Sequence, residues 1–441
     1  MARRKSTRRR KNAKGARIRK DLKKLVPKKR LEALAKETGA VKRQRKVYVE
    51  HLFWTLVLGF AGAKERTLAG LRRAFEKAAG VTLVPSAFYD RFTAGLVRLM
   101  KSVLGEVMEK ASGPSRELRG ALAAFKEVLA TDSTIVRLHK LLKAKWPACR
   151  TNHTEAALKA HVILSVVGCG ASSVKVTSER VHDGPVLRAG QWVKDRLLLF
   201  DLGYYRFQLF ARIAECKGFF LTRLKDGANP TITGVFRRWR GQSVELVGQK
   251  LQDVLSKLQR QILDVEVELT FERHFYRGKK RKDKMRCRVV GILNEETGRY
   301  HLYVTNVPVE TLSAEEVGRV YAARWLIELA FRELKSNYEL EAMPSAKANI
   351  VETLLYAAFI TMMVSRTLLQ ALRARHQALA DRFPAERWAA IFRGVAGDLL
   401  SVMLFPCDVA NAIAERVMRM VEQEALDPNA TRALLLERAE G

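Results

Sequence analysis

The sequence predicts a mixed α/β protein with helical segments at both ends and a sheet in its centre. Two apolar runs that each end in an aspartate, 126–132 and 196–201, are typical of buried strands. Much of the stretch 265–304 alternates between apolar and polar side chains, as strands do. Apolar residues recur at helical spacing before residue 112 and after residue 311. The 441 residues, 48% of them hydrophobic, are enough for about three domains.

Four helices are expected in the N-terminal part. Pro27 and Gly39 frame the first, the second covers 47–58, Thr67 caps a third that runs to Gly80, and the fourth follows Pro85 from 87 to about 110. The inner side of the fourth helix is expected to carry Phe88, Phe92, Leu96 and Leu99. The turn at 80–85 is compatible with a helix-turn-helix that binds DNA, and equally with a bundle that only braces the rest of the chain.

The centre of the chain is expected to form one sheet with crossing helices. After the first aspartate strand we expect strands at 161–167 and 172–179, a helix at 185–194, the second aspartate strand, a helix at 205–216 and a strand at 219–223. The interval between Asp201 and Glu328 is too long for a simple crossover. Its alternating segments, 265–271, 286–290 and 300–304, predict a β-rich insertion.

The charge of the chain predicts a polyanionic partner. The formal net charge is +34 and the pI is near 10.3, and residues 1–46 alone carry +18 of that charge. We expect residues 2–20 to be disordered without DNA, because they are too charged to bury a core. Phosphate contacts along DNA are the function that this arm suggests. A tail that binds RNA or a membrane surface is the alternative.

Several classes of protein are disfavoured. The five cysteines are widely spaced without a Cys-x-x-Cys pair, which favours a reducing, cytoplasmic compartment and argues against structural zinc. The basic N-terminus is not followed by the apolar segment of a secretory signal. The apolar run 354–364 is too short to span a bilayer and is expected to be a core helix, so no membrane is predicted. The sequence lacks a P-loop, so no nucleotide cofactor is expected.

Four polar residues downstream share one stripe of a predicted helix. At about 100° per residue, Tyr321, Arg324, Glu328 and Lys335 fall on one side, and apolar residues occupy the opposite side. Ser313 predicts the start of this helix, because Glu316 three residues later completes a capping box. The alternative is a solvated face with salt bridges along the helix.

Two aspartates are expected to join this stripe. Asp132 and Asp201 end the two apolar strands, and side chains at the carboxyl ends of neighbouring strands meet at one edge of a sheet. If they meet Glu328, three carboxylates share one site and require a hard cation, Mg²⁺ or Mn²⁺. For each aspartate alone, a role in capping a turn or helix is the alternative.

These motifs resemble those of the DDE transposases of prokaryotic insertion sequences, in the subgroup known as insertion-sequence family four. The subgroup signature is Tyr, two residues, Arg, three residues, Glu, six residues, Lys (YREK), and it stands here at 321–335. The segments 130–134 and 199–205 are similar to the motifs around the first and second aspartates of that family, and 302–307 is similar to the segment before its Glu helix. The resemblance covers about residues 125–370.

The resemblance implies a ribonuclease-H-like core and a two-metal reaction. Asp132 would bridge two Mg²⁺ or Mn²⁺ ions, and Asp201 and Glu328 would each hold one, for DNA cleavage and strand transfer. Arg324 and Lys335 would clamp phosphates beside Tyr321. In members of the subgroup a tryptophan holds a flipped base, and Trp325 and Trp239 are candidates. Further expected DNA contacts are Arg332 on the Glu helix and, in two basic clusters of the insertion, Arg237, Arg238, Lys279, Lys280 and Arg281. Solvated loops are the alternative for both clusters.

The predicted organisation has six segments. They are a basic arm (1–46), a helical DNA-binding domain (47–112), the first part of the ribonuclease-H-like core (113–224), the β-rich insertion (225–310), the Glu helix with its successor (311–375) and C-terminal helices (376–441). The expected partners are double-stranded DNA, as terminal inverted repeats and target, and a second copy of the chain on paired ends. The expected location is the cytoplasm, at the nucleoid. A nuclease of the same fold that no longer transposes and a non-enzymatic DNA-binding protein are the alternatives.

Overall fold

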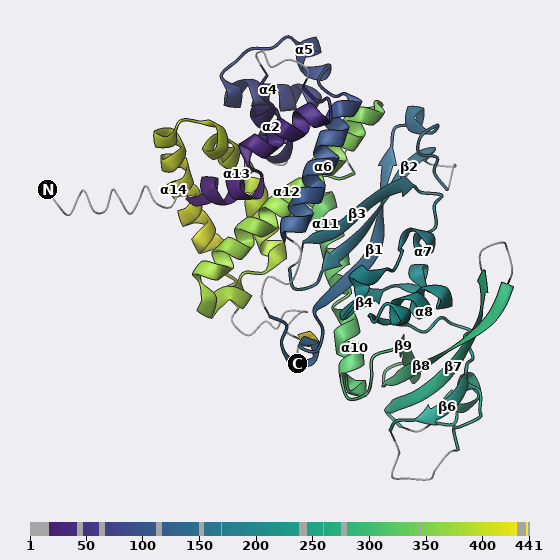
Figure 1. Cartoon of the computed structure of the whole chain (residues 1–441). Helices are drawn as coiled ribbons and strands as arrows, with labels where there is room; N and C mark the ends of the chain where they lie inside the picture. The colour runs from purple at the N-terminus through teal and green to yellow at the C-terminus, as the bar shows by residue number, and fades with distance from the viewer. Residues whose placement is uncertain are drawn as a thin grey trace.

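The computed structural model describes residues 17–41, 47–60, 67–111, 117–149, 154–168, 170–237, 245–258, 260–274, 280–341, 343, 345–429 and 438–439. In this part of the chain, helices from both ends gather on one side of a large mixed sheet (Figure 1). The predicted α/β class, with helices before and after a central sheet, is therefore confirmed.

The N-terminal helices start and end where the local sequence predicts, with two corrections. They are residues 17–25, α2 (Lys28–Glu37), α3 (Val49–Trp54) with a π-helical continuation (Thr55–Gly59), α4 (Leu68–Ala79), α5 (Pro85–Tyr89) and α6 (Ala94–Ala111). The Thr67 side chain caps α4, and Gly80 ends it with a φ of 66°. The single helix predicted for 87–110 is wrong. The chain breaks after α5, and Thr93 caps α6 by accepting a hydrogen bond from the Leu96 amide.

The second correction concerns residues 17–20, which were expected to be disordered. They belong to a helix in which Ile18 and Leu22, one turn apart, are buried. Arg19 of this helix donates a hydrogen bond of 2.7 Å from Nε to the carbonyl oxygen of Val402, near the end of a C-terminal helix. The high local charge hid the apolar side of this turn, and the surface that covers it lies almost four hundred residues away.

The sheet joins the central strands and the insertion. The strands are β1 (Glu127–Leu138), β2 (Ala156–Ser165), β3 (Ala171–Ser178), β4 (Arg196–Phe200), β5 (Phe219–Arg223), β6 (Thr231–Val235), β7 (Ile262–His274), β8 (Lys280–Asn294) and β9 (Arg299–Thr305). Their order is β3-β2-β1-β4-β5-β9-β8-β7-β6. The central strands β1, β4 and β5 are parallel, and the outer pairs are antiparallel. The strands predicted in the insertion are confirmed, and β9 connects them to the central sheet by pairing with β5.

One predicted helix of the centre is wrong. Residues 185–194 form only the end of the short helix α7 (Asp183–Val186) and a 3₁₀ turn (Gln191–Val193). Gly190 between them has an extended backbone, which interrupts any helix. The next predicted helix is confirmed as α8 (Phe207–Glu215), and α9 (Leu251–Leu255) precedes β7. The protein has two clusters of buried apolar residues, a main core and a second, smaller one. Helices α8 and α9 contribute to the second core, together with β4, β5 and strands of the insertion.

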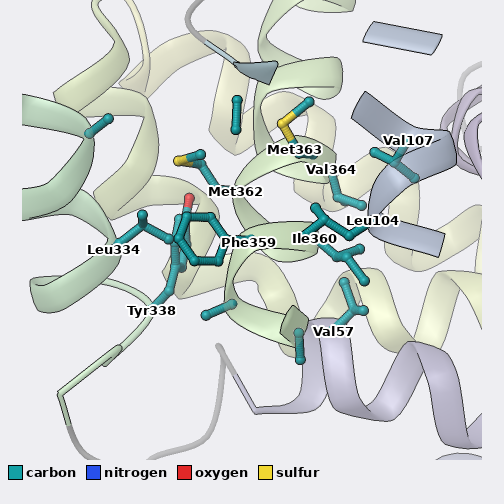
Figure 2. Packing of buried hydrophobic residues seen from close by; sticks show 14 of the residues in the cluster. Val57, Leu104, Val107, Leu334, Tyr338, Phe359, Ile360, Met362, Met363 and Val364 are labelled. Carbon is teal, nitrogen blue, oxygen red and sulfur yellow. The ribbon is translucent and has the colours of Figure 1, made fainter. Parts of the chain in front are cut away.

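The C-terminal helices complete the main core. They are α10 (Ala314–Ala322), α11 (Trp325–Ser336), α12 (Ala348–Arg375), α13 (Ala385–Leu404) and α14 (Cys407–Glu424). Helix α12 is long and apolar enough to cross a membrane by length and composition, yet 83% of its most apolar window is buried inside the protein. Figure 2 shows how its Phe359 and Met362 face Leu334 and Tyr338, while Ile360 and Val364 face Leu104 and Val107 of α6. This central helix therefore connects the N-terminal helices to the region around α11.

Candidate active site

The two aspartates follow neighbouring positions of two adjacent parallel strands, at the end of the sheet where β4 finishes. Strands β1 and β4 run parallel, and their last paired residues are Thr131 and Phe200. Asp132 and Asp201 come next, so the register alone brings both to the same edge. β4 ends at this point, whereas β1 continues to Leu138 along β2, so the expectation that the first strand ends at Asp132 is wrong. The side chain of Asp201 makes no capping hydrogen bond, although it precedes a 3₁₀ turn. A capping role therefore does not account for this aspartate.

The four-residue stripe is divided between two helices. The predicted capping box is confirmed, since Ser313 and Glu316 exchange hydrogen bonds at the start of α10. That helix ends at Ala322, however, and α11 begins at Trp325. The prediction of one continuous helix is wrong at this point. The intervening amides bond three residues back instead of four, as in the 3.0 Å bond from the Arg324 amide to the carbonyl of Tyr321. The tighter turn rotates Tyr321 relative to Glu328.

Arg324 occupies the space between the carboxylates. Its Nη2 lies 2.6 Å from Oε1 of Glu328, and its Nη1 lies 3.7 Å from Oδ2 of Asp132. Burial lowers the pKa of the Arg324 guanidinium group, but its hydrogen bond to Glu328 and the charges of Tyr321, Glu328 and Asp201 outweigh burial and raise the pKa. One cation thus faces three carboxylates, and the site keeps an excess of negative charge.

The pKa of Asp132 is raised, chiefly by burial. Burial is the largest influence and raises the pKa of this carboxyl to about 6, and the charges of Asp201 and Glu328 act in the same direction. The Ser133 amide, which donates a 2.7 Å hydrogen bond to Oδ1, and the Arg324 charge only partly oppose them. A carboxyl whose ionised form is disfavoured in this way gains from an added cation.

The ring of Tyr321 packs beside the guanidinium group of Arg324. It is buried, its ring packs against Tyr303 of β9 at 5.2 Å between centroids, and the Arg324 guanidinium lies 5.7 Å from its ring centroid. Burial raises the pKa of the Tyr321 hydroxyl to about 12, so it stays protonated at neutral pH. The aromatic face and the buried position hold Arg324 close to the carboxylates.

The donor set suits a hard divalent cation. All three acidic groups offer oxygen, which Mg²⁺ and Mn²⁺ prefer. As arranged, with Arg324 among them, the described residues include no group of three His, Cys, Asp or Glu side chains spaced to hold a metal ion. Asp132 and Glu328 both contact Arg324, and the charge of Asp201 acts on the same group, so the three carboxylates offer oxygen ligands in one region of the protein.

Comparison with known proteins shows the family of the chain. The family model described as "Transposase DDE domain" matches residues 123–364, more than half of the chain. The chain belongs to this family.

Relatives place the protein among transposases of insertion sequence elements. The transposase for insertion sequence element IS231C of Bacillus thuringiensis subsp. berliner is 22% identical over 377 residues, which cover 78% of this chain and 77% of that protein. The probable transposase for element IS5377 of Geobacillus stearothermophilus is 27% identical over 272 residues, 61% of this chain and 63% of that protein. Among solved structures, a piggyBac transposase synaptic complex with hairpin DNA gives a TM-score of 0.44 at 8% identity, over 91% of this chain and 83% of that one.

The other residues of α11 that are predicted to contact DNA in this DDE transposase are partly or fully exposed. Lys335 is partly exposed and pairs with Glu341 at 2.6 Å, so its ammonium group does not touch Glu328. Trp325 is half exposed at the first turn of α11, and Arg332 is exposed on the same helix. Both are accessible to a large ligand such as DNA.

The basic clusters of the insertion are only partly described. Arg237 pairs with Glu315 at the start of α10, and Arg281 is exposed near the start of β8. Arg238, Trp239 and Lys279 lie outside the described residues, and of Lys280 only the backbone, in β8, is described. Their proposed contacts with DNA stay predictions.

Asp183 is a supporting residue of the transposase site that the sequence did not reveal. Its Oδ1 lies 3.3 Å from Nδ1 of His161 and 3.4 Å from Nζ of Lys159. Burial alone would raise its pKa, but the contacts with His161 and Ser133 and the charge of Lys159 outweigh burial and lower the pKa to about 2. A Cβ added at Gly203 would lie 3.4 Å from its Oδ2. Asp183 thus touches the segments that follow both aspartates. Only the pairing of β1 with β2 brings these residues together, so no local pattern could predict them.

Proposed function

We propose that this transposase of insertion sequence elements cleaves and joins DNA ends with Asp132, Asp201 and Glu328 as ligands of two divalent ions. The observation that supports the proposal is that Asp132 and Glu328 both pair with the Arg324 guanidinium group, on which the charge of Asp201 also acts. The residues 321–335 carry the YREK spacing on the helix pair α10–α11. When bound, the ions would activate the attacking hydroxyl and stabilise the leaving oxygen.

The protein's own groups prepare the phosphate site. Arg324 has a planar fork that matches two phosphate oxygens, and Tyr321 keeps this fork at the edge of the sheet. Lys335 is on the same helix and can exchange its partly exposed partner Glu341 for a phosphate. The half-exposed Trp325 is available to stack on a base beside the scissile bond.

The arrangement of the central sheet favours a ribonuclease-H-like core. Strands β3, β2 and β1 form an antiparallel unit that continues into the parallel strands β4 and β5, and α11 lies against β1. We further propose double-stranded terminal repeats and target DNA as substrates, a homodimer on paired ends, and a location at the nucleoid. The net charge of +34 supports the DNA partner.

The test is cleavage and strand transfer on a duplex that carries the terminal repeats flanking the gene. We expect activity with Mg²⁺ or Mn²⁺ and none with EDTA, and a 3′-hydroxyl end should join to target DNA. Full activity in EDTA would refute the metal mechanism. Cleavage without any joining would favour a nuclease.

A further inference from the structure

A buried ion pair lies on α11, away from the side that carries Glu328. Glu333 is 4% exposed, and its Oε2 pairs with Nη2 of Arg366 on α12, which is 6% exposed. The other carboxylate oxygen accepts a hydrogen bond of 2.8 Å from the hydroxyl of Tyr338. Neither residue belongs to the YREK spacing, and the mechanism above does not use them.

The pair belongs to a polar network that joins three helices. Next to Arg366, the main-chain oxygen and hydroxyl of Ser365 both accept hydrogen bonds of 3.0 Å from the indole nitrogen of Trp388 on α13. The Tyr338 ring meets Phe392 of α13 edge-on, at 6.1 Å between centroids. Burial raises the pKa of the Tyr338 hydroxyl, so it remains a hydrogen-bond donor. The C-terminal half of α11 is therefore fixed to α12 and α13 by directional contacts.

Helix geometry connects this network to the active site. Glu328 and Glu333 are five residues apart, which separates their directions by roughly 140° around the helix. While Glu333 points to α12, Glu328 points to β1 and Arg324. Any rotation of α11 that moves one carboxylate moves the other.

Apolar packing alone defines this rotation less sharply. Leu334 and Tyr338 meet Phe359 and Met362 in the core (Figure 2). Flexible side chains such as methionine adapt to small shifts of a neighbouring helix, whereas a hydrogen-bonded charge pair does not. A shift of about 1 Å in a reacting group can cost on the order of a hundredfold in rate.

We propose that Glu333 and Arg366 are positioning residues that hold α11 at the rotation in which Glu328 meets Asp132 and Asp201. Stability alone does not require charges here, because well-packed apolar replacements of a buried ion pair are often neutral or stabilising. The inference rests on the proposed role of Glu328 as a metal ligand.

The experiment replaces the pair without leaving an unpaired charge. The double variant Glu333→Leu/Arg366→Met is compared with the full-length wild type, with Glu328→Gln, and with Val417→Ala on the buried side of α14 as a destabilised control remote from the site. Each protein is bound to a duplex of its own terminal repeat. Mn²⁺ affinity is measured by electron paramagnetic resonance, together with cleavage rate and thermal melting.

We expect the double variant to melt at or above the wild-type temperature, yet to bind Mn²⁺ about tenfold more weakly and to cleave at least tenfold more slowly, as loss of an outer-shell partner does. Val417→Ala should melt lower and bind Mn²⁺ normally. Arg366→Lys in the presence of Glu333 keeps the charge pair. Its Mn²⁺ affinity should therefore lie between that of the double variant and that of the wild type.

The outcomes separate the two proposals. Wild-type Mn²⁺ affinity and cleavage in a folded double variant would overturn the positioning role while leaving the proposed function intact, provided that Glu328→Gln loses affinity. If Glu328→Gln also binds Mn²⁺ like the wild type, or the wild type binds none, the metal proposal fails and the positioning role fails with it.

Discussion

Two groups of charges lie on α11, and they differ in how fully the charges are balanced. Around Arg324, one cation faces three carboxylates at a partly open edge of the sheet, and the pKa of Asp132 rises to about 6. Around Arg366, one cation faces one carboxylate inside the core, and a tyrosine hydroxyl binds the remaining oxygen. In the first group the carboxylates outnumber the cation that contacts them, whereas the second pairs one buried carboxylate with one buried cation. We therefore propose that the same residue types serve chemistry in one place and position a helix in the other.

The largest expected effect tests the unbalanced group. Asp132→Asn, Asp201→Asn and Glu328→Gln should each reduce cleavage by a factor of roughly a thousand or more, because each removes one ligand charge, while DNA binding survives. Cleavage of a terminal-repeat duplex and a gel-shift titration check this. Wild-type cleavage by any one variant in Mg²⁺ would remove that residue from the ligand set.

Removal of one partner of the balanced group should also lower stability. Arg366→Ala leaves the Glu333 carboxylate buried without a partner, and we expect the free energy of unfolding to fall by about 3–5 kcal/mol. Denaturant unfolding provides the measurement. The exposed pair Arg30–Glu106 offers a control, since Arg30→Ala should leave stability almost unchanged. An equally small change for Arg366→Ala would remove the contrast between the groups.

The pH dependence of stability should differ in sign between Asp132 and Asp183. The folded pKa of Asp132, about 6, lies above its unfolded value of 3.8, so the native state binds the extra proton between these values. Stability is therefore lost as the pH rises from about 4 to about 6, by an amount on the order of 2–3 kcal/mol. Asp132→Asn should raise the melting temperature at pH 7.5 in metal-free buffer, with a gain that shrinks toward pH 4.5.

Asp183→Asn is the matched control for this pH test. Because its folded pKa is depressed, Asp183 stabilises the protein above its unfolded pKa, and the contribution disappears as the pH falls toward about 2. This variant should therefore melt lower than the wild type at pH 7.5. Two variants that shift melting in the same direction at pH 7.5 would contradict the assigned charge environments.

A smaller effect on stability is expected for substitutions of Lys335. They distinguish a role in phosphate binding from a role in a surface salt bridge. Lys335→Ala loses only the partly exposed pair with Glu341, so stability should change by less than about 1 kcal/mol. Cleavage should nevertheless fall by about tenfold or more, and Lys335→Arg should rescue it only in part. Cleavage rates measured beside thermal melting decide this. Normal cleavage by Lys335→Ala would leave the pair with Glu341 as its only role.

Truncation of the N-terminus should have the smallest effect on the site. Deleting 1–16 removes eight positive charges and should weaken DNA binding and flatten its salt dependence. Deleting 1–20 should in addition lower the melting temperature, because Ile18 and the Arg19 bond to Val402 are lost. Binding titrations at several salt concentrations and melting curves test both. Equal melting temperatures for the two truncations would contradict the packing of residues 17–20.

The sequence determined most of the elements and the identity of the three carboxylates. Period-two and helical patterns, the capping box at Ser313 and apolar runs that end in aspartate are local signals, and local hydrogen bonding obeys them. The helical pattern predicted one helix where the chain forms two, between α5 and α6 and at Ala323–Arg324. Hydrogen bonds three residues back, or a capping threonine, interrupt a helix there without changing the spacing of its apolar residues.

Only the tertiary structure decided how charges are balanced around those carboxylates. Arg366 follows Glu333 by thirty-three residues and Asp183 follows His161 by twenty-two, and each pair meets only because elements distant in the sequence pack together. Burial then sets the pKa values, raising that of Asp132 while the cations around Asp183 lower its pKa. The amino-acid sequence determines which charged groups are present. The desolvation and partners that turn this charge into a ligand or an anchor depend on surfaces that are brought together by folding.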